Sequence, residues 1–216
     1  MEGITYDYMV DYLRGLIHDT LPVIKDLEAY AEENNIPIVQ KETGRFLEVI
    51  TAIQRPAKIL ELGTAIGYSS ILMSEALNNE VEITTIERDP KMIALAGENI
   101  KKYGYSNIQI LEGEALEILD DLEGIFDMIF LDGGQGHYNH YLPHCLRLLD
   151  KDGIIVADNV LFRGMVASDE LIKRRKITIV KRMRKFLDEV NANPTLVTSV
   201  IPMGDGIAIT RRRIKT

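Results

Sequence analysis

Short apolar runs alternate with amphipathic segments through the middle of the chain, and this alternation limits the possible folds more than any other feature. Five runs have the length and the β-branched or aromatic content of buried strands, at 57–62, 81–86, 107–111, 125–131 and 153–157. Helices are expected between them, near 68–78, 90–103, 114–121 and 138–149. Nearly continuous apolar strands separated by helices are typical of a parallel sheet covered by helices on both faces.

Both ends of the chain extend this core. Amphipathic segments near 4–18, 22–34 and 41–54 predict N-terminal helices over about residues 1–54. After a basic helix expected near 173–192, the strands TLVTSVIP and GIAITRRR are joined by MGDG, which predicts an antiparallel hairpin. A parallel sheet with an antiparallel C-terminal pair is typical of class I methyltransferases. We therefore predict one α/β domain over residues 1–216, a Rossmann-like three-layer sandwich with a mostly parallel seven-stranded sheet.

Composition agrees with a soluble globular domain. The chain has 216 residues, 46% hydrophobic and 27% charged, and no stretch approaches the roughly 18 apolar residues of a membrane span. Its N-terminus is acidic and amphipathic, unlike a secretory signal. Cys145 is the single cysteine, so an internal disulfide is impossible and a small core residue is expected there. A reducing cytoplasm is the expected location, with no membrane association.

Charge is distributed unevenly along the chain. Residues 1–159 carry a net charge of −16, whereas residues 160–216 carry +8. The cations concentrate in a basic segment at 173–185, directly after the last parallel strand. This asymmetry indicates either a polyanionic partner or a solvated helix face, and the sequence leaves both open.

A glycine loop after the first strand predicts a nucleoside site. In ILELGTAIGYSS, Gly63 and Gly67 let the backbone pass close to a ligand, and their spacing differs from the G-x-G-x-x-G of dinucleotide-binding folds. Glu87 ends the second strand, where an acidic side chain can accept hydrogen bonds from ribose hydroxyls. The sequence EGEA at 112–115 closes the third strand, where an adenine would lie.

Three oxygen-bearing side chains follow two further strands. Asp132 ends the run FDMIFLD, and Asp158 and Asn159 end the run GIIVADN. Ligands of parallel α/β sheets bind outside the carboxyl ends of the strands, so these side chains are expected to meet. Two carboxylates and an amide oxygen suit Mg²⁺ or another hard divalent cation. Capping of a turn and of a helix is the alternative role for the same residues.

With these motifs the sequence resembles the cation-dependent O-methyltransferases, the family of catechol and caffeoyl-CoA O-methyltransferases. The resemblance covers nearly the whole chain and rests on ELGTAIGYSS, TIERDP, FLDGG, VADNVL and PMGDGIAIT. It implies transfer of a methyl group from S-adenosylmethionine to a hydroxyl, with Asp132, Asp158 and Asn159 as catalytic metal ligands. The cofactor contacts that we predict are Val39, Glu61, Gly63, Ser69, Glu87, Glu114, Ala115 and Asp132.

One position departs from the family pattern. Related enzymes carry a lysine, proposed as general base, three residues after the first metal aspartate, and this chain has Gln135 there. An amide cannot take up a proton, so either the metal alone activates an acidic hydroxyl or another group serves as base. His137 is near enough in sequence to be considered, although a surface histidine is the more ordinary interpretation.

The acceptor is predicted from the basic segment together with the resemblance. Some bacterial relatives methylate 5-hydroxyuridine in the tRNA anticodon loop, and the cations at 173–185 suit a phosphate backbone. We therefore predict tRNA as partner and 5-methoxyuridine as product. A small catechol, a phenol or a phenylpropanoid-CoA ester is the alternative acceptor, and a non-enzymatic, cofactor-sensing RNA-binding module is a third possibility. The N-terminal helices and the resemblance also predict a homodimer.

Overall fold

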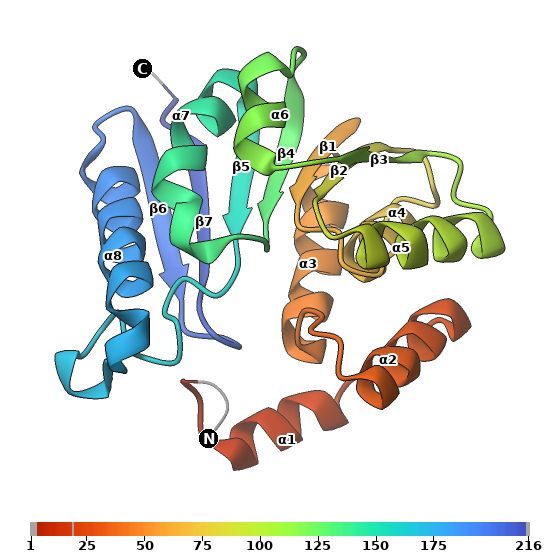
Figure 1. The fold of residues 1–216 in the computed structure, drawn as a ribbon, viewed down its shortest axis with the longest axis horizontal. Coiled ribbons are helices and arrows are strands. Elements are labelled where there is room, and N and C mark those ends of the chain that lie inside the picture. Colours follow the sequence, from red (N-terminus) through yellow and green to blue (C-terminus); the bar gives the residue numbers. More distant parts are fainter. Residues whose placement is uncertain (1–3, 19, 215–216) are drawn as a thin grey trace.

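A computed structural model describes residues 4–18 and 20–214 and shows a seven-stranded sheet in the order β3-β2-β1-β4-β5-β7-β6 (Figure 1). All strand pairs are parallel except those of β7, which is antiparallel to both β5 and β6. The strands are β1 (Lys58–Leu62), β2 (Glu82–Glu87), β3 (Ile108–Glu112), β4 (Phe126–Leu131), β5 (Leu149–Ala157), β6 (Leu196–Ile201) and β7 (Ile207–Arg212). The predicted mixed sheet with its C-terminal hairpin is confirmed.

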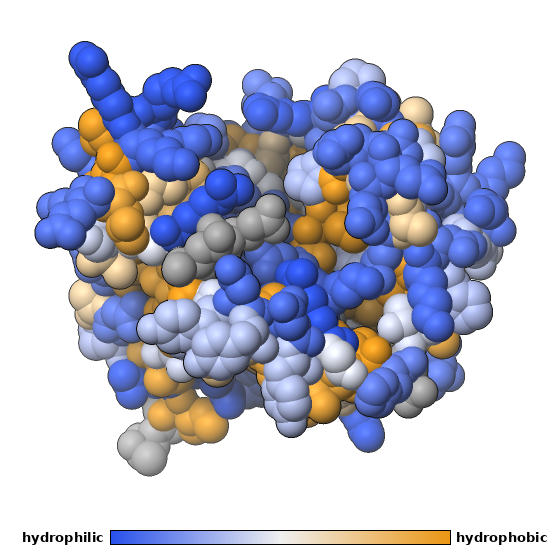
Figure 2. Space-filling view, turned by 90° about the horizontal axis from the view of Figure 1, so that it is seen from below, coloured by the Kyte–Doolittle hydropathy of each residue, from blue (hydrophilic) through white to orange (hydrophobic). Residues whose placement is uncertain are grey.

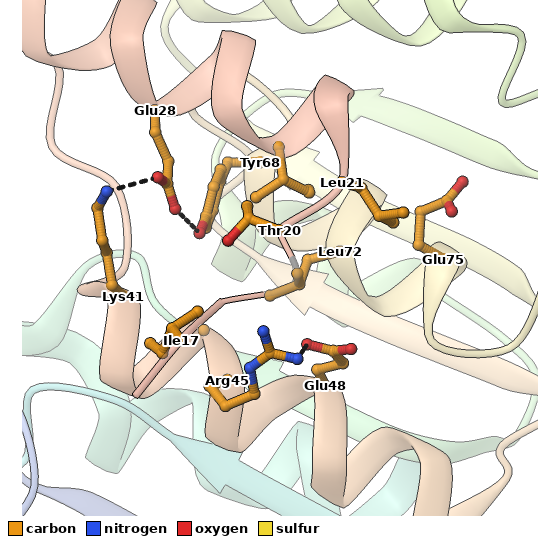
Figure 3. Close-up of a pocket in the computed structure, with 12 residues that line it drawn as sticks. Ile17, Thr20, Leu21, Glu28, Lys41, Arg45, Glu48, Tyr68, Leu72 and Glu75 are labelled. Carbon is orange, nitrogen blue, oxygen red and sulfur yellow. Dashed lines mark hydrogen bonds and ion pairs between the residues drawn. The ribbon is translucent and has the colours of Figure 1, made fainter. Parts of the chain in front are cut away.

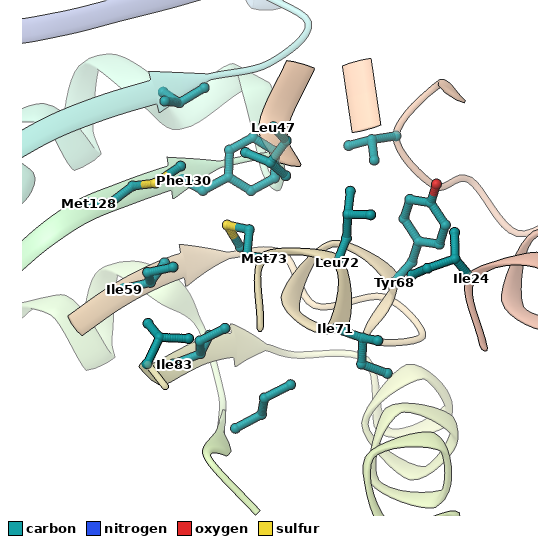
Figure 4. Close-up of a cluster of buried hydrophobic side chains, with 14 of the residues drawn as sticks. Ile24, Leu47, Ile59, Tyr68, Ile71, Leu72, Met73, Ile83, Met128 and Phe130 are labelled. Atoms are coloured by element: carbon teal, nitrogen blue, oxygen red, sulfur yellow. The ribbon is translucent and has the colours of Figure 1, made fainter. Parts of the chain in front are cut away.

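Helices cover both faces of the sheet because each strand sends alternate apolar side chains to opposite sides. Met128 and Phe130 of β4 point to one buried cluster, and Ile129 and Leu131 point to the other. Figure 4 shows the first cluster, in which Phe130 packs near Leu47 and Met73. The α-helices are α1 (Asp7–Gly15), α2 (Pro22–Asn34), α3 (Lys41–Gln54), α4 (Tyr68–Glu75), α5 (Pro90–Tyr103), α6 (Ala115–Asp121), α7 (Tyr138–Leu148) and α8 (Ile177–Ala192).

The strand order reverses between β1 and β4, and this reversal creates the place for a ligand. From β1 the chain proceeds to β2 and β3 on one side, and from β4 it proceeds to β5 on the other. In register, Leu62 of β1 lies beside Leu131 of β4, which lies beside Ala157 of β5. The next residue of each strand therefore emerges at the same edge, and such switch points are where open α/β sheets bind ligands.

Two boundaries differ by four residues from the sequence-based prediction. Strand β5 begins at Leu149, four residues before the expected Gly153, because Leu149 still pairs with Phe126 across a register shift. The basic helix α8 begins only at Ile177, since Arg174–Lys176 form a short 3-10 turn, η3. Consecutive cations are unfavourable at a helix N-terminus, where the helix dipole is positive.

The N-terminal helices α2 and α3 both pack against α4. A cavity of about 60 Å³ lies between α2, α3 and α4, and four of its charged side chains form two ion pairs, Glu28 with Lys41 and Arg45 with Glu48 (Figure 3). Glu28 accepts a hydrogen bond from the Tyr68 hydroxyl at 3.0 Å and forms an ion pair with Lys41 at 2.7 Å. Glu28 therefore holds α2 against α3 and α4. No helix in the described part of the chain is long and apolar enough to cross a membrane.

Candidate active site

Two glycines bring the ends of β1 and β4 into backbone contact. Gly63 has φ +105°, and a Cβ atom built on it would lie 2.8 Å from the Gly133 nitrogen. A Cβ atom on Gly133 would in turn lie 2.9 Å from the Gly63 Cα. Only glycine at both positions permits this approach. The contact lies where two cavities meet, one of about 280 Å³ and one of about 330 Å³, and both glycines line each cavity.

The smaller of these cavities contains the predicted metal ligands. Asp132, Asp158 and Asn159 all line it, and the Asn159 amide nitrogen donates to Asp132 Oδ1 at 3.1 Å. Asn159 has φ +61°, a conformation that asparagine tolerates better than most residues, and its backbone nitrogen donates to Asp158 Oδ1 at 2.7 Å. The structure therefore brings together the three side chains that the sequence placed at the strand ends.

The two aspartates form an uncompensated anionic pair. Burial, followed by repulsion from Asp158 and Glu61, holds the pKa of Asp132 well above its ordinary value. Burial also raises the pKa of Asp158 to about 7, with further repulsion from Asp205 and Glu42. Buried carboxylates without a cationic partner are costly, and a bound divalent cation would remove that cost.

The donor set fits a hard cation. No group of three or more histidine, cysteine, aspartate or glutamate side chains within residues 4–18 and 20–214 is placed to bind a metal, so the predicted site depends on an amide as its third ligand. Rotation of the Asn159 side-chain amide would turn Oδ1 toward the two carboxylates in place of the nitrogen. Carboxylate and amide oxygens are the ligands that Mg²⁺ and Ca²⁺ prefer in proteins.

Glu87 is fixed at the junction of the two cavities and lines both. Its Oε1 accepts hydrogen bonds from the backbone nitrogens of Arg88 and Asp89 at 2.9 and 3.0 Å, and its Oε2 accepts from Ala65 at 3.0 Å. Because Oε2 receives only one of these bonds, it retains a lone pair for a ligand hydroxyl. The carboxylate is thus pre-oriented for the ribose contact predicted from its position after β2.

The other predicted cofactor residues divide into two groups. Val39 lines the 280 Å³ cavity, and Glu114 and Ala115 line the 330 Å³ cavity, where Glu114 forms an ion pair with Arg88 at 3.1 Å. Glu61 and Ser69 line neither cavity.

Glu61 is instead fully buried beneath the glycine loop. Its carboxylate accepts hydrogen bonds from the hydroxyls of Ser69 at 2.5 Å, Thr85 at 2.6 Å and Ser70. Burial raises the pKa of Glu61 despite these three donors. The side chain therefore ties the start of α4 to β1 and β2, and direct contact of Glu61 or Ser69 with a cofactor stays a prediction.

Gln135 and His137 occupy different positions around the junction. Gln135 lines both cavities, whereas His137 lines only the larger one. Burial lowers the pKa of His137, and the charge of Arg182 lowers it further. His137 therefore lines the larger cavity and not the cavity that contains the aspartates.

The basic segment is only partly free for a partner. Arg182 donates to the Gly136 carbonyl at 3.1 Å and lines the larger cavity. Arg184 donates to the Val166 carbonyl at 2.9 Å and forms an ion pair with Asp169 at 2.7 Å. The cations that remain exposed are Lys173, Arg174, Arg175, Lys176, Lys181 and Lys185.

Sequence reasoning missed several residues of the smaller cavity, and two of them are Asp205 and Thr43. Asp205 lies in the turn before β7, lines the cavity and accepts a hydrogen bond from the Arg163 backbone nitrogen. Thr43 of α3 also lines it, and its hydroxyl is buried without a hydrogen-bond partner in the described part of the chain. The MGDG motif signalled a hairpin turn, and only the folded chain brings that turn to the ends of the parallel strands.

The sheet order, the glycine contact at the switch point and the acidic residue after β2 define a class I, S-adenosylmethionine-dependent methyltransferase. The structure agrees with solved methyltransferases. It is similar to an S-adenosylhomocysteine-bound methyltransferase of Podospora anserina, PaMTH1, with a TM-score of 0.88 and 26% identity, covering 96% of this chain and 95% of that one.

The chain belongs to the O-methyltransferase family, whose model matches residues 18–213. It is 34% identical over 202 residues to a catechol O-methyltransferase of Niastella koreensis, which covers 91% of this chain and 89% of that protein. It is also 31% identical to caffeoyl-CoA O-methyltransferase 1 of Eucalyptus globulus, across 82% of this chain and 76% of that protein. The predicted S-adenosylmethionine-dependent O-methyltransferase of the catechol and caffeoyl-CoA type is confirmed.

Proposed function

We propose that this O-methyltransferase methylates the 5-hydroxyl of 5-hydroxyuridine in tRNA and uses Mg²⁺ or another hard divalent cation. Asp132, Asp158 and Asn159 would hold the cation, since they converge in one cavity and carry the appropriate oxygen donors. Glu87 would accept a ribose hydroxyl of S-adenosylmethionine at the junction with the second cavity.

The chemistry divides between the bound groups and the chain. When bound, S-adenosylmethionine supplies an electrophilic methyl group and the cation lowers the pKa of the acceptor hydroxyl. The chain's contribution is to hold the two reactants in line and close together, which supplies much of the acceleration. Gln135 cannot accept a proton, so the proposal requires an acceptor hydroxyl that is itself acidic. The enolic 5-hydroxyl of the modified uridine, beside the C4 carbonyl, meets this requirement.

Exposed cations beside the site are the observation that carries the tRNA proposal. Arg174–Lys176 form η3, which leads into α8, and the Lys176 ammonium lies 5.6 Å from the ring centre of Phe162 in the loop that follows Asn159. Figure 2 looks onto this side of the molecule, where hydrophilic side chains border a recess. A phosphate backbone is attracted to such a cluster of cations.

A small catechol or phenolic acceptor is the second candidate. The similarity to a catechol O-methyltransferase and to a caffeoyl-CoA O-methyltransferase favours it. Two neighbouring oxygens of a catechol can bind a cation as the 5-hydroxyl and C4 carbonyl of the uridine can.

Methyl-acceptor assays would separate the candidates. The purified protein is given labelled S-adenosylmethionine and Mg²⁺ with tRNA from a strain that lacks the protein, with the same tRNA after RNase digestion, or with catechol. The proposal predicts label in 5-methoxyuridine from intact tRNA. Label only in catechol would establish the second candidate, and label in neither despite S-adenosylmethionine binding would reject both.

The role of these cations is tested by the salt dependence of tRNA binding. The variant with alanine at Lys173, Arg174, Arg175 and Lys181 should bind tRNA more weakly, and the slope of log K against log salt should fall by about 0.7–0.9 per lost phosphate contact. A matched control removes four lysines from other faces, Lys25, Lys58, Lys101 and Lys151. Equal slopes for the two variants would show that 173–181 is only a solvated surface.

A further inference from the structure

A buried tyrosine hydroxyl joins the two strand ends that carry the predicted metal ligands. Tyr138 is the first residue of α7 and is fully buried. Its hydroxyl oxygen lies 2.8 Å from the Leu131 carbonyl oxygen and 3.1 Å from the Asp158 carbonyl oxygen. Its ring packs edge-on against Phe186 of α8, with 5.5 Å between the ring centres.

Each of these carbonyls immediately precedes a predicted ligand. Leu131 is the last residue of β4, so its carbonyl belongs to the peptide that leads into Asp132. The Asp158 carbonyl belongs to the peptide that leads into Asn159. The single hydroxyl hydrogen is therefore shared between, or alternates between, the two peptides that orient all three side chains.

Two other hydrogen bonds among the described residues tie these two segments together beyond the strand pairing, and one of them joins the Asn159 amide to Asp132 Oδ1. The Asp158 backbone nitrogen donates to the same Leu131 carbonyl at 2.9 Å, and the next residue, Asn159, turns into the left-handed region. The Tyr138 hydroxyl makes its hydrogen bonds where the regular strand pairing between β4 and β5 ends.

We propose that Tyr138 is a positioning residue for the metal site: its hydroxyl fixes the relative placement of the ends of β4 and β5 so that the oxygens of Asp132, Asp158 and Asn159 converge. This inference rests on the metal site proposed above. Groups that orient metal ligands are part of a metal site even when they do not touch the ion.

Tyr138→Phe removes the hydroxyl and keeps the ring. Binding of Mn²⁺ is measured by the electron paramagnetic resonance signal of the free ion, without methyl acceptor or turnover. The expected result is an Mn²⁺ affinity weakened by about 10-fold or more. Binding of S-adenosylhomocysteine, measured by calorimetry, should change far less, because Tyr138 lines neither cavity.

Two control variants separate positioning from packing. Tyr105→Phe removes another buried tyrosine's hydroxyl bond, 2.7 Å to Glu75, at a distance from the strand ends, and should leave Mn²⁺ affinity unchanged. Phe186→Leu loosens the packing around the Tyr138 ring while it keeps the hydroxyl, and should lower stability with little effect on Mn²⁺ affinity.

The outcomes are distinguishable. Equal Mn²⁺ affinity for Tyr138→Phe and wild type would overturn the positioning role and leave the metal site standing. An equal loss of Mn²⁺ affinity in Tyr138→Phe and Phe186→Leu would assign the effect to packing. That result would also overturn the positioning role of Tyr138. Absence of Mn²⁺ binding by the wild type would reject the proposed metal site and this inference together.

Discussion

Gly133→Ala should separate the ends of β1 and β4 and disturb both cavities at once. The new Cβ would lie 2.9 Å from the Gly63 Cα and 3.0 Å from the Leu62 carbonyl oxygen, and both are backbone atoms that cannot rotate away. Ordinary carbon contacts begin near 3.4 Å. The two strand ends must therefore move apart by about 0.5 Å, as in other overpacked sites.

The expected cost follows from this displacement. Overpacking of a rigid site typically lowers the free energy of unfolding by about 1–3 kcal/mol. Gly133 does not need a positive φ, so the loss would be steric and would contain no backbone-strain contribution. A shift of about 0.5 Å is also the limit that a functional site tolerates, so the affinity for S-adenosylhomocysteine should fall by about 10-fold.

Urea unfolding and calorimetry with S-adenosylhomocysteine measure the two effects. Gly97→Ala is the matched control, because Gly97 lies in α5 and a Cβ there meets no atom within 4 Å. That substitution should raise stability by about 0.5–1 kcal/mol and leave ligand affinity unchanged. Wild-type stability and wild-type affinity in Gly133→Ala would refute the role assigned to the glycine contact.

Three further expectations concern single side chains. Glu87→Ala should weaken S-adenosylhomocysteine binding by about 1.5–3 kcal/mol in calorimetry, with Mn²⁺ affinity unchanged; unchanged ligand affinity would contradict the ribose contact. Burial raises the pKa of Asp158 from 3.8 to about 7, so the folded state binds more protons, and the free energy of unfolding without metal should fall as pH rises through this range. Asp158→Asn should reduce that dependence in urea unfolding at pH 5 and pH 8, and an identical dependence would refute the assignment. Leu13 of α1 is 38% exposed beside a groove of about 540 Å³, and if this face holds the predicted homodimer, Leu13→Asp should shift sedimentation toward the monomer, whereas an unshifted dimer would place the contact elsewhere.

The sequence by itself determined the sheet and the edge where the site lies. Apolar runs and helical periodicity depend on neighbouring residues in the chain, so strands such as β1 and β4 were predicted to within one residue. The placement of Asp132 and Asp158 at one edge follows from parallel topology alone, because parallel strands end on the same side.

Tertiary structure decided which of the side chains predicted from the sequence are available to a ligand. Glu61 stands beside Gly63 in the sequence, yet three hydroxyls from α4 and β2 enclose its carboxylate. Arg182 belongs to a run of cations, yet it bonds to the loop after β4. Asp205 and Tyr138 reach the site from a hairpin turn and from a helix start. These partners lie on different elements of the fold, so local pattern cannot reveal them, and only the packing of the folded domain brings them into contact.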